Sequence, residues 1–246
     1  MNLLFLVEGK RTEPKIYKSW LSHLFPYLNF VVKPEDMTNN SCRIISGNGY
    51  PNMVSSPKKS AGISRLEACL LDIKNYRNVD SFFICVDSEE ETYQDRFEEI
   101  NSRLEYLKTQ IRIDQSQETK FHIIIQHCCI ETWALGNAEI PNQYTSQNSS
   151  VDFSVLQSHY DILINDPELM TCPPSHPSTK QCFHHTYLRE YLKEFGLFYS
   201  KTRPKSIVEK KYLDALIKRC TSTNHLSSLK YLLDIWEQMR NSEAIE

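Results

Sequence analysis

The sequence predicts an α/β fold with a mostly parallel sheet and flanking helices, followed by a helical C-terminal region. Three mainly apolar runs, at residues 3–7, 81–86 and 121–126, have the length of buried strands. Segments with helical spacing separate these runs. Strands that alternate with helices favour a parallel sheet covered on both faces.

The first run, at residues 3–7, leads into a helix expected over 14–24, where apolar residues recur with helical spacing. Thr12, Glu13 and Pro14 are typical of a helix start. The remaining expected elements are short strands at 28–32 and 43–45, a polar and flexible loop at 47–59, a helix at 63–76 and a helix at 96–111.

After residue 140 the sequence becomes polar and carries prolines, and no strand pattern returns. Helical spacing reappears at residues 183–195, 207–220 and 226–239. We therefore expect an α/β domain over residues 1–140 and a helical region over 141–246 that packs on it.

Composition places the chain among ordinary globular proteins, with 40% hydrophobic and 24% charged residues. Its eight cysteines form no Cys-x-x-Cys pair, which argues against a zinc or disulfide framework. The N-terminal apolar run is too short for a signal peptide or a membrane span, so we expect a cytoplasmic protein.

The charge is unevenly distributed, although the net charge is only -3. Residues 87–99 hold seven acids and one arginine, whereas residues 178–219 hold ten Lys or Arg and four acids. The total therefore predicts no general attraction to nucleic acid, and we expect local fields to matter more than the net charge.

Carboxylates follow three of the predicted strands. Glu8, Asp87 and Glu131 lie at or just beyond the ends of these runs. Because ligands of parallel sheets bind beyond the carboxyl ends of the strands, we expect these acids at one edge. Asp87 and Glu89 would face the same side of an extended segment. Carboxylate oxygens suit Mg²⁺, so the pattern predicts a metal site, in which Glu8 has the alternative role of general acid or base.

Four segments carry a resemblance to a known family. The segment LFLVEGKRTEP at residues 4–14 resembles the opening of the Toprim (topoisomerase–primase) fold, and FFICVDSE at 82–89 resembles its later Asp-x-Asp strand. The segments IETWAL at 130–135 and YSKT at 199–202 resemble parts of small stand-alone Toprim nucleases of phage defence. These are the RloB-like and AriB-like relatives of OLD-family nucleases. The second Asp of Asp-x-Asp is replaced by a glutamate.

The resemblance implies an Mg²⁺- or Mn²⁺-dependent nuclease that cleaves DNA or RNA, with tRNA among the candidates, as an effector of anti-phage defence. A regulatory or sensor protein of the same system would be its partner. The catalytic residues implied are Glu8, Asp87, Glu89 and Lys201. The metal ligands implied are Glu8, Asp87, Glu89, Glu91 and Glu131. The residues expected to bind nucleic acid are Lys10, Arg11, Lys201, Arg203 and Lys205.

Other interpretations stay open. A Toprim nucleotidyltransferase would share the metal site, and a non-catalytic module that binds nucleic acid or protein would keep the fold with an inert acidic edge. Acidic runs such as residues 89–91 are usually solvated helix starts. The aromatic residues near the C-terminal cations are expected in the core, with base stacking as the alternative; they are Tyr187, Tyr191, Phe198 and Tyr199.

Two further groups carry reactive or metal-binding atoms. His127 with Cys128 or Cys129 invites a nucleophilic interpretation, but their place beside a buried strand favours structural cysteines. A second group lacks paired zinc spacing, so no zinc site is predicted there; it comprises Cys172, His176, Cys182, His184 and His185.

Overall fold

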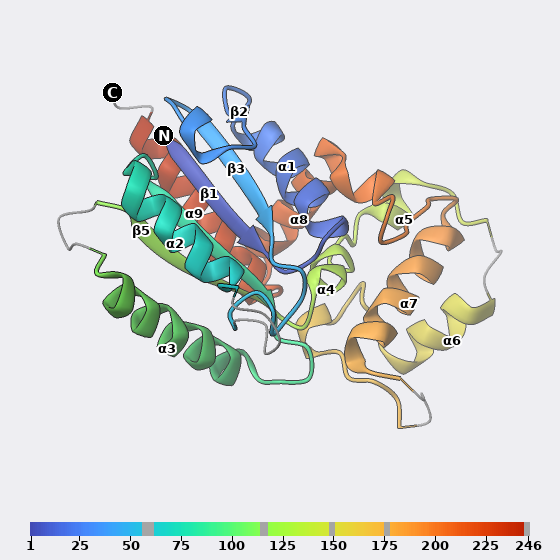
Figure 1. Cartoon of the computed structure of the whole chain (residues 1–246). Helices are drawn as coiled ribbons and strands as arrows, with labels where there is room; N and C mark the ends of the chain where they lie inside the picture. The colour runs from blue at the N-terminus through green and yellow to red at the C-terminus, as the bar shows by residue number, and fades with distance from the viewer. Residues whose placement is uncertain (56–61, 114–117, 148–150, 175–177, 244–246) are drawn as a thin grey trace. The chain divides into compact units, whose positions relative to one another are not determined.

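The computed structural model describes residues 1–55, 62–113, 118–147, 151–174 and 178–243 (Figure 1). The chain divides into two compact units. The first comprises Met1–Val86 and Thr92–Ile125, and the second comprises Asp87–Glu91 and Gln126–Glu246. The predicted domains 1–140 and 141–246 differ from these units and stay a prediction.

The described residues form a five-stranded, all-parallel sheet, which confirms the predicted α/β class. The strand order is β2-β3-β1-β4-β5. The predicted strands are all present, with shifted ends and with the second one shortened to two residues. The bounds are β1 (Asn2–Val7), β2 (Asn29–Phe30), β3 (Ser41–Ser46), β4 (Ser81–Asp87) and β5 (Lys120–Gln126).

The chain adds strands first on one side of β1 and then on the other. From β1 the chain goes to β2 and β3 on one side and then crosses to β4 and β5 on the other. Val7 lies in register with Ser46 of β3 and with Cys85 of β4, so the three strands end close to one level. The gap between β1 and β4 is therefore the switch point of this sheet, where ligands of open α/β sheets bind.

Three helices belong to the first unit: α1 (Thr12–Leu24), α2 (Arg65–Tyr76) and α3 (Tyr93–Ile111). Ser64 and Thr92 accept the backbone N–H groups that begin α2 and α3, which fixes both starts. The apolar faces of α2 and α3 pack on one face of the sheet, around side chains such as Leu70 and Leu104 (Figure 1). Each buried side chain of this size stabilises the fold by about 1.5–3 kcal/mol.

Aromatic side chains fill the opposite face of the sheet. The rings of Phe5 on β1 and Phe83 on β4 stack at 4.4 Å between centroids. Tyr17 of α1 lies 5.6 Å from Phe5, so α1 packs on this face. A 3-10 helix, η1 (Pro34–Asp36), connects β2 to β3.

The second unit is helical, as predicted. Its three longest helices match the predicted ones with shifted ends, whereas α6 was not expected because its apolar residues lack a helical period. Gly196, with φ of 67°, follows the end of α7, where a left-handed residue favours glycine. The bounds are α4 (Ile130–Ala134), α5 (Ile140–Gln143), α6 (Val151–His159), η2 (Pro167–Leu169), α7 (Lys180–Glu194), η3 (Lys205–Val208), α8 (Lys210–Ser222) and α9 (Ser227–Glu243).

None of the helices in the described part of the chain is both long and apolar enough to cross a membrane.

Candidate functional site

Glu8 directly follows β1 and is held by backbone groups on both sides. Its N–H donates to Cys85 O at 3.1 Å, and its carbonyl accepts the N–H of Gly49 at 3.0 Å. The carboxylate Oε1 accepts the N–H of Tyr50 at 3.2 Å, while only 7% of the residue is exposed. The first part of the predicted flexible loop is therefore tied to Glu8, and residues 56–59 of that loop lie outside the described residues.

In the turn after Glu8, Gly9 lies against the side chain of Glu13. A Cβ atom at Gly9 would lie 2.8 Å from Oε1 of Glu13, so that carboxylate would have to shift to admit a side chain. Glu13 is buried at the start of α1. Lys10 and Arg11, predicted to bind nucleic acid, are exposed in this turn.

Asp87 is the last residue of β4 and is 4% exposed. Its Oδ2 accepts a hydrogen bond of 3.0 Å from Nε2 of Gln181 on α7. The residues after Asp87 are held by backbone hydrogen bonds within the second unit: Ser88 N donates to Gln126 O and Glu89 N donates to Cys128 O, both at 3.0 Å. These bonds hold the loop that contains the predicted metal ligands.

The conformation of Glu89 corrects one part of the prediction. Strand β4 ends at Asp87, and Glu89 has φ of 54°, in the left-handed region. The alternation of an extended chain therefore does not apply to the step from Asp87 to Glu89. The role of Glu89 as a metal ligand stays a prediction, and the geometry of a strand no longer supports it.

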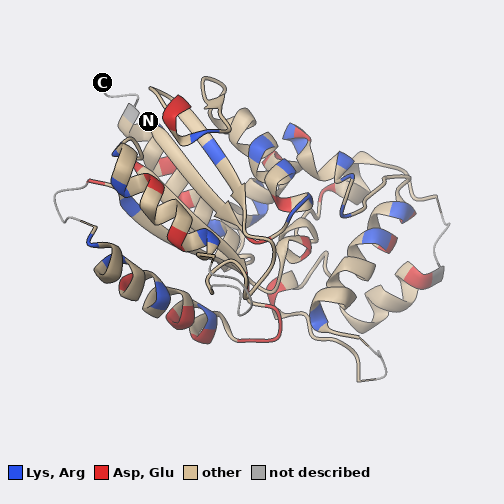
Figure 2. Cartoon of the chain, in the orientation of Figure 1, with Lys and Arg blue, Asp and Glu red and all other residues tan. Residues whose placement is uncertain are grey.

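The rest of the acidic loop, red in Figure 2, precedes α3 without forming its first turn. Glu90 instead accepts the backbone N–H of Lys180 at 2.6 Å and so caps the start of α7. A carboxylate is stabilised there by the helix dipole. Glu91 is exposed, and its N–H donates to Ser88 O at 3.0 Å. The sequence predicted that Glu91 and Glu89 both contribute to metal binding, and for Glu91 this also stays a prediction.

Glu131 lies on α4 in the interior, with 2% of its surface exposed. The hydroxyl of Tyr199 donates to its Oε1 at 2.7 Å, and Nζ of Lys201 lies 4.0 Å from the same oxygen. Burial raises the pKa of Tyr199, and the charge of Glu131 acts in the same direction, so the phenol keeps its proton. The structure thus brings the predicted residues Glu131 and Lys201 together.

The predicted basic segment forms a tight turn. The N–H groups of Ser200 and Arg203 each donate to the carbonyl of the other. Lys201, Arg203 and Lys205 are exposed. Nζ of Lys205 lies 5.7 Å from the ring centroid of Phe198.

The aromatic residues of this region divide into two kinds. Tyr187, Tyr191 and Tyr199 are buried, which confirms the core interpretation for these three. Phe198 is 52% exposed, so for this residue the core interpretation is wrong and base stacking stays a prediction.

A buried polar cluster lies between β5 and α4. Cys129 precedes the first residue of α4, and the backbone N–H groups of Cys128 and Cys129 donate to Oγ1 of Thr132 at 3.2 and 3.3 Å. A hydrogen bond from Cys129 lowers the pKa of Cys128. Burial raises the pKa of Cys129, and the charges of Glu131 and Asp87 add to this effect. Both carboxylates therefore lie in the electrostatic surroundings of Cys129.

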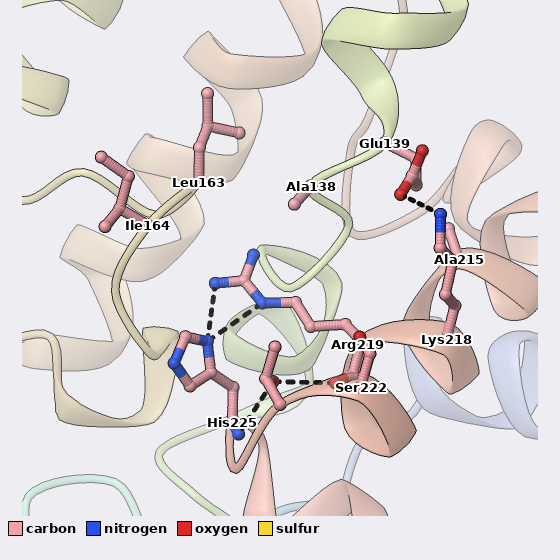
Figure 3. A pocket seen from close by; sticks show the side chains of 10 residues that line it. Ala138, Glu139, Leu163, Ile164, Ala215, Lys218, Arg219, Ser222 and His225 are labelled. Atoms are coloured by element: carbon pink, nitrogen blue, oxygen red, sulfur yellow. Dashed lines mark hydrogen bonds and ion pairs between the residues drawn. The ribbon is translucent and has the colours of Figure 1, made fainter.

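The second unit also contains a pocket of about 150 Å³ that does not include the predicted residues (Figure 3). Arg219 donates to the carbonyl of Asn165 at 2.8 Å and to Nδ1 of His225 at 3.0 Å. Lys218 forms an ion pair of 2.7 Å with Glu139. The cations of this pocket already have protein partners, so it is a weaker candidate than the acidic sheet edge.

Sequence reasoning missed the groups that hold the predicted acids. Gln181 contacts Asp87 from a position 94 residues later in the chain, and an isolated glutamine carries no sequence signal for this role. Tyr199 was placed in the core without its bond to Glu131. Glu13 lies in the first turn of α1, as the sequence predicted, and its burial was not expected.

Comparisons with protein-family models, with characterised proteins and with solved structures find no match for this chain.

Proposed function

We propose that this protein is a divalent-metal-dependent nuclease of the Toprim type. The observation that carries the proposal is the position of Glu8 and Asp87. Glu8 follows β1 and Asp87 ends β4, the two neighbouring strands at which the order of the sheet reverses. Acids at this point of a parallel sheet occupy the usual ligand crevice. Hard divalent cations take carboxylate oxygens as ligands, and both residues supply them at this point.

The donor atoms fit Mg²⁺ or Mn²⁺. Glu8 and Asp87 offer carboxylate oxygens that are oriented by Tyr50 N–H and Gln181, and hard cations prefer such oxygens. When bound, the metal would polarise a phosphoryl oxygen and lower the pKa of a coordinated water. Glu89, Glu91 and Glu131 are the further ligands that we propose.

The protein residues would bind and orient the nucleic acid. Lys201 has a side chain that is 51% exposed and lies near Glu131, a suitable place to contact the scissile phosphate. Lys10, Arg11, Arg203 and Lys205 are exposed cations that would contact other phosphates. A role in anti-phage defence, under the control of a sensor protein, belongs to the same proposal and rests on the sequence resemblance alone.

The test is cleavage by the purified protein. Plasmid, single-stranded DNA and total tRNA are incubated separately with Mn²⁺, Mg²⁺ or EDTA, and the products are separated on gels. We expect cleavage of at least one substrate with metal and none with EDTA. Primer extension with nucleotides instead of cleavage would identify a nucleotidyltransferase. The absence of both reactions and of millimolar metal binding by calorimetry would identify a non-catalytic module.

Variants connect the activity to the site. Glu8→Ala and Asp87→Asn should abolish cleavage and leave the circular dichroism spectrum unchanged. Glu35→Ala and Asp214→Asn are matched controls, because they remove the same charge from exposed positions in the first and second unit. Unchanged cleavage in both Glu8→Ala and Asp87→Asn would refute the proposed site.

A further inference from the structure

Two thiols and an imidazole meet inside the second unit, in a group that contains none of the carboxylates of the proposed nuclease site. Cys128 and Cys129 lie between β5 and α4, and His184 lies on α7. All three residues are completely buried. The two Sγ atoms and one ring nitrogen of the histidine lie within 4.8 Å of one another. The group combines residues from the two sets that the sequence analysis had considered separately.

The hydrogen bonds of the histidine leave one ring nitrogen without a proton, as a metal ligand requires. Its Nε2 lies 3.1 Å from the carbonyl oxygen of Met170 and must donate a proton to it, because a carbonyl only accepts. Nδ1 therefore carries the lone pair, and it lies 2.7 Å from Oγ1 of Thr132. Histidines that bind metals usually donate their other N–H to a carbonyl or carboxylate in this way.

The distances suit a small tetrahedral or trigonal site. Two sulfurs bound to one zinc ion at about 2.3 Å lie roughly 3.8–4.0 Å apart. In the structure the two sulfurs lie at most 4.8 Å apart, which is no more than about 1 Å beyond the separation in a zinc site. Side-chain rotation can close this difference. Binding would replace the hydrogen bond between Thr132 and His184.

The chemistry selects the ion. Thiolate and imidazole ligands favour zinc over Mg²⁺ or Mn²⁺. Two thiolates and a neutral imidazole carry two negative charges, which Zn²⁺ cancels, so the filled site would bury no net charge. We infer that Cys128, Cys129 and His184 form a zinc site, with its fourth position open to a non-protein ligand or to Thr132. This inference does not depend on the proposed nuclease activity.

The experiment measures metal content directly. The full chain is expressed with added zinc, purified without chelators and analysed by mass spectrometry for metals, and we expect about one zinc per chain. Protein produced with Co²⁺ should show the near-ultraviolet absorption of thiolate bound to cobalt. Cys128→Ser and His184→Asn should each lower zinc content by about tenfold or more, since even indirect contacts to metal ligands change affinity by about 10–100-fold.

Two cysteines provide matched controls. Cys182 is exposed on α7, two residues before His184, and Cys220 is buried in the same unit outside the group. Cys182→Ser and Cys220→Ser should keep the zinc content of the wild type. If a cluster variant does not fold, the zinc content and cobalt spectrum of the wild type decide the question. Wild-type protein with no zinc above the buffer level and no thiolate–cobalt absorption would overturn the inference.

Discussion

The hydrogen bond between Tyr199 and Glu131 should stabilise the second unit measurably. Tyr199→Phe removes only the hydroxyl that donates to Glu131 Oε1 at 2.7 Å. Glu131 is 2% exposed, so water cannot replace the lost donor easily. A hydrogen bond to a charged group contributes about 1.5–3 kcal/mol. We expect a loss of about 2 kcal/mol, which lowers the Tm by about 4–8 °C in a unit of this size.

The loss can be measured by urea titration in EDTA, followed by tryptophan fluorescence. Trp133 lies two residues from Glu131 and is completely buried, so it reports on this region. Tyr231→Phe is the control, because Tyr231 lies on α9 with 44% of its surface exposed. We expect this control to change stability by less than about 0.5 kcal/mol. If Tyr199→Phe also stays within that limit, the bond does not stabilise the unit as argued.

Three other predictions concern the second unit. Burial raises the pKa of Glu168 above its unfolded value near 4.5. The folded state therefore binds this proton more tightly, and the contribution of Glu168 to stability falls as pH rises from about 4.5 through the folded pKa. Glu168→Gln should flatten this fall in denaturation measured from pH 4.5 to 8; an unchanged profile would contradict it. A Cβ atom on Gly136 would lie 2.2 Å from Cδ1 of Leu226, so Gly136→Ala should lower the free energy of unfolding by about 1–3 kcal/mol, and a stability equal to wild type would be inconsistent with this packing. Arg219→Lys should lower it by about 1.5–3 kcal/mol, because lysine cannot reproduce the bonds to Asn165 and His225; urea titration would show an unchanged midpoint if those bonds contribute nothing.

The sequence predicted β1 and β4 well because both strands are buried along nearly their whole length and are therefore almost continuous apolar runs. The run at residues 81–86 became β4 with one residue added. Helix α6 escaped prediction because Phe153 is buried while Val155 is exposed, and the two together give no helical period. Strand β2 contains only two residues. The predicted strand at 28–32 was longer because it included apolar neighbours that do not belong to the strand.

The positions of Glu8 and Asp87 at the ends of strands were predicted, because a place after an apolar run is a local signal. The groups that contact the predicted acids were not predicted. Gln181 reaches Asp87, and Tyr199 reaches Glu131, from positions 94 and 68 residues away in the sequence. Single residues at such separations leave no sequence pattern. The extended conformation predicted for Glu89 was wrong, because the prediction continued the strand past Asp87.

The loop from Asp87 to Glu91 lies between two segments of the first unit in the sequence but belongs to the second unit. The loop contacts Lys180 and Gln181 on α7. These two residues leave the ribosome about 90 residues after the loop itself. The sheet can therefore form during synthesis while its acidic loop still lacks its fixed neighbours. A nascent chain would therefore pass through a stage with a folded sheet and an acidic loop that still lacks its contacts with α7.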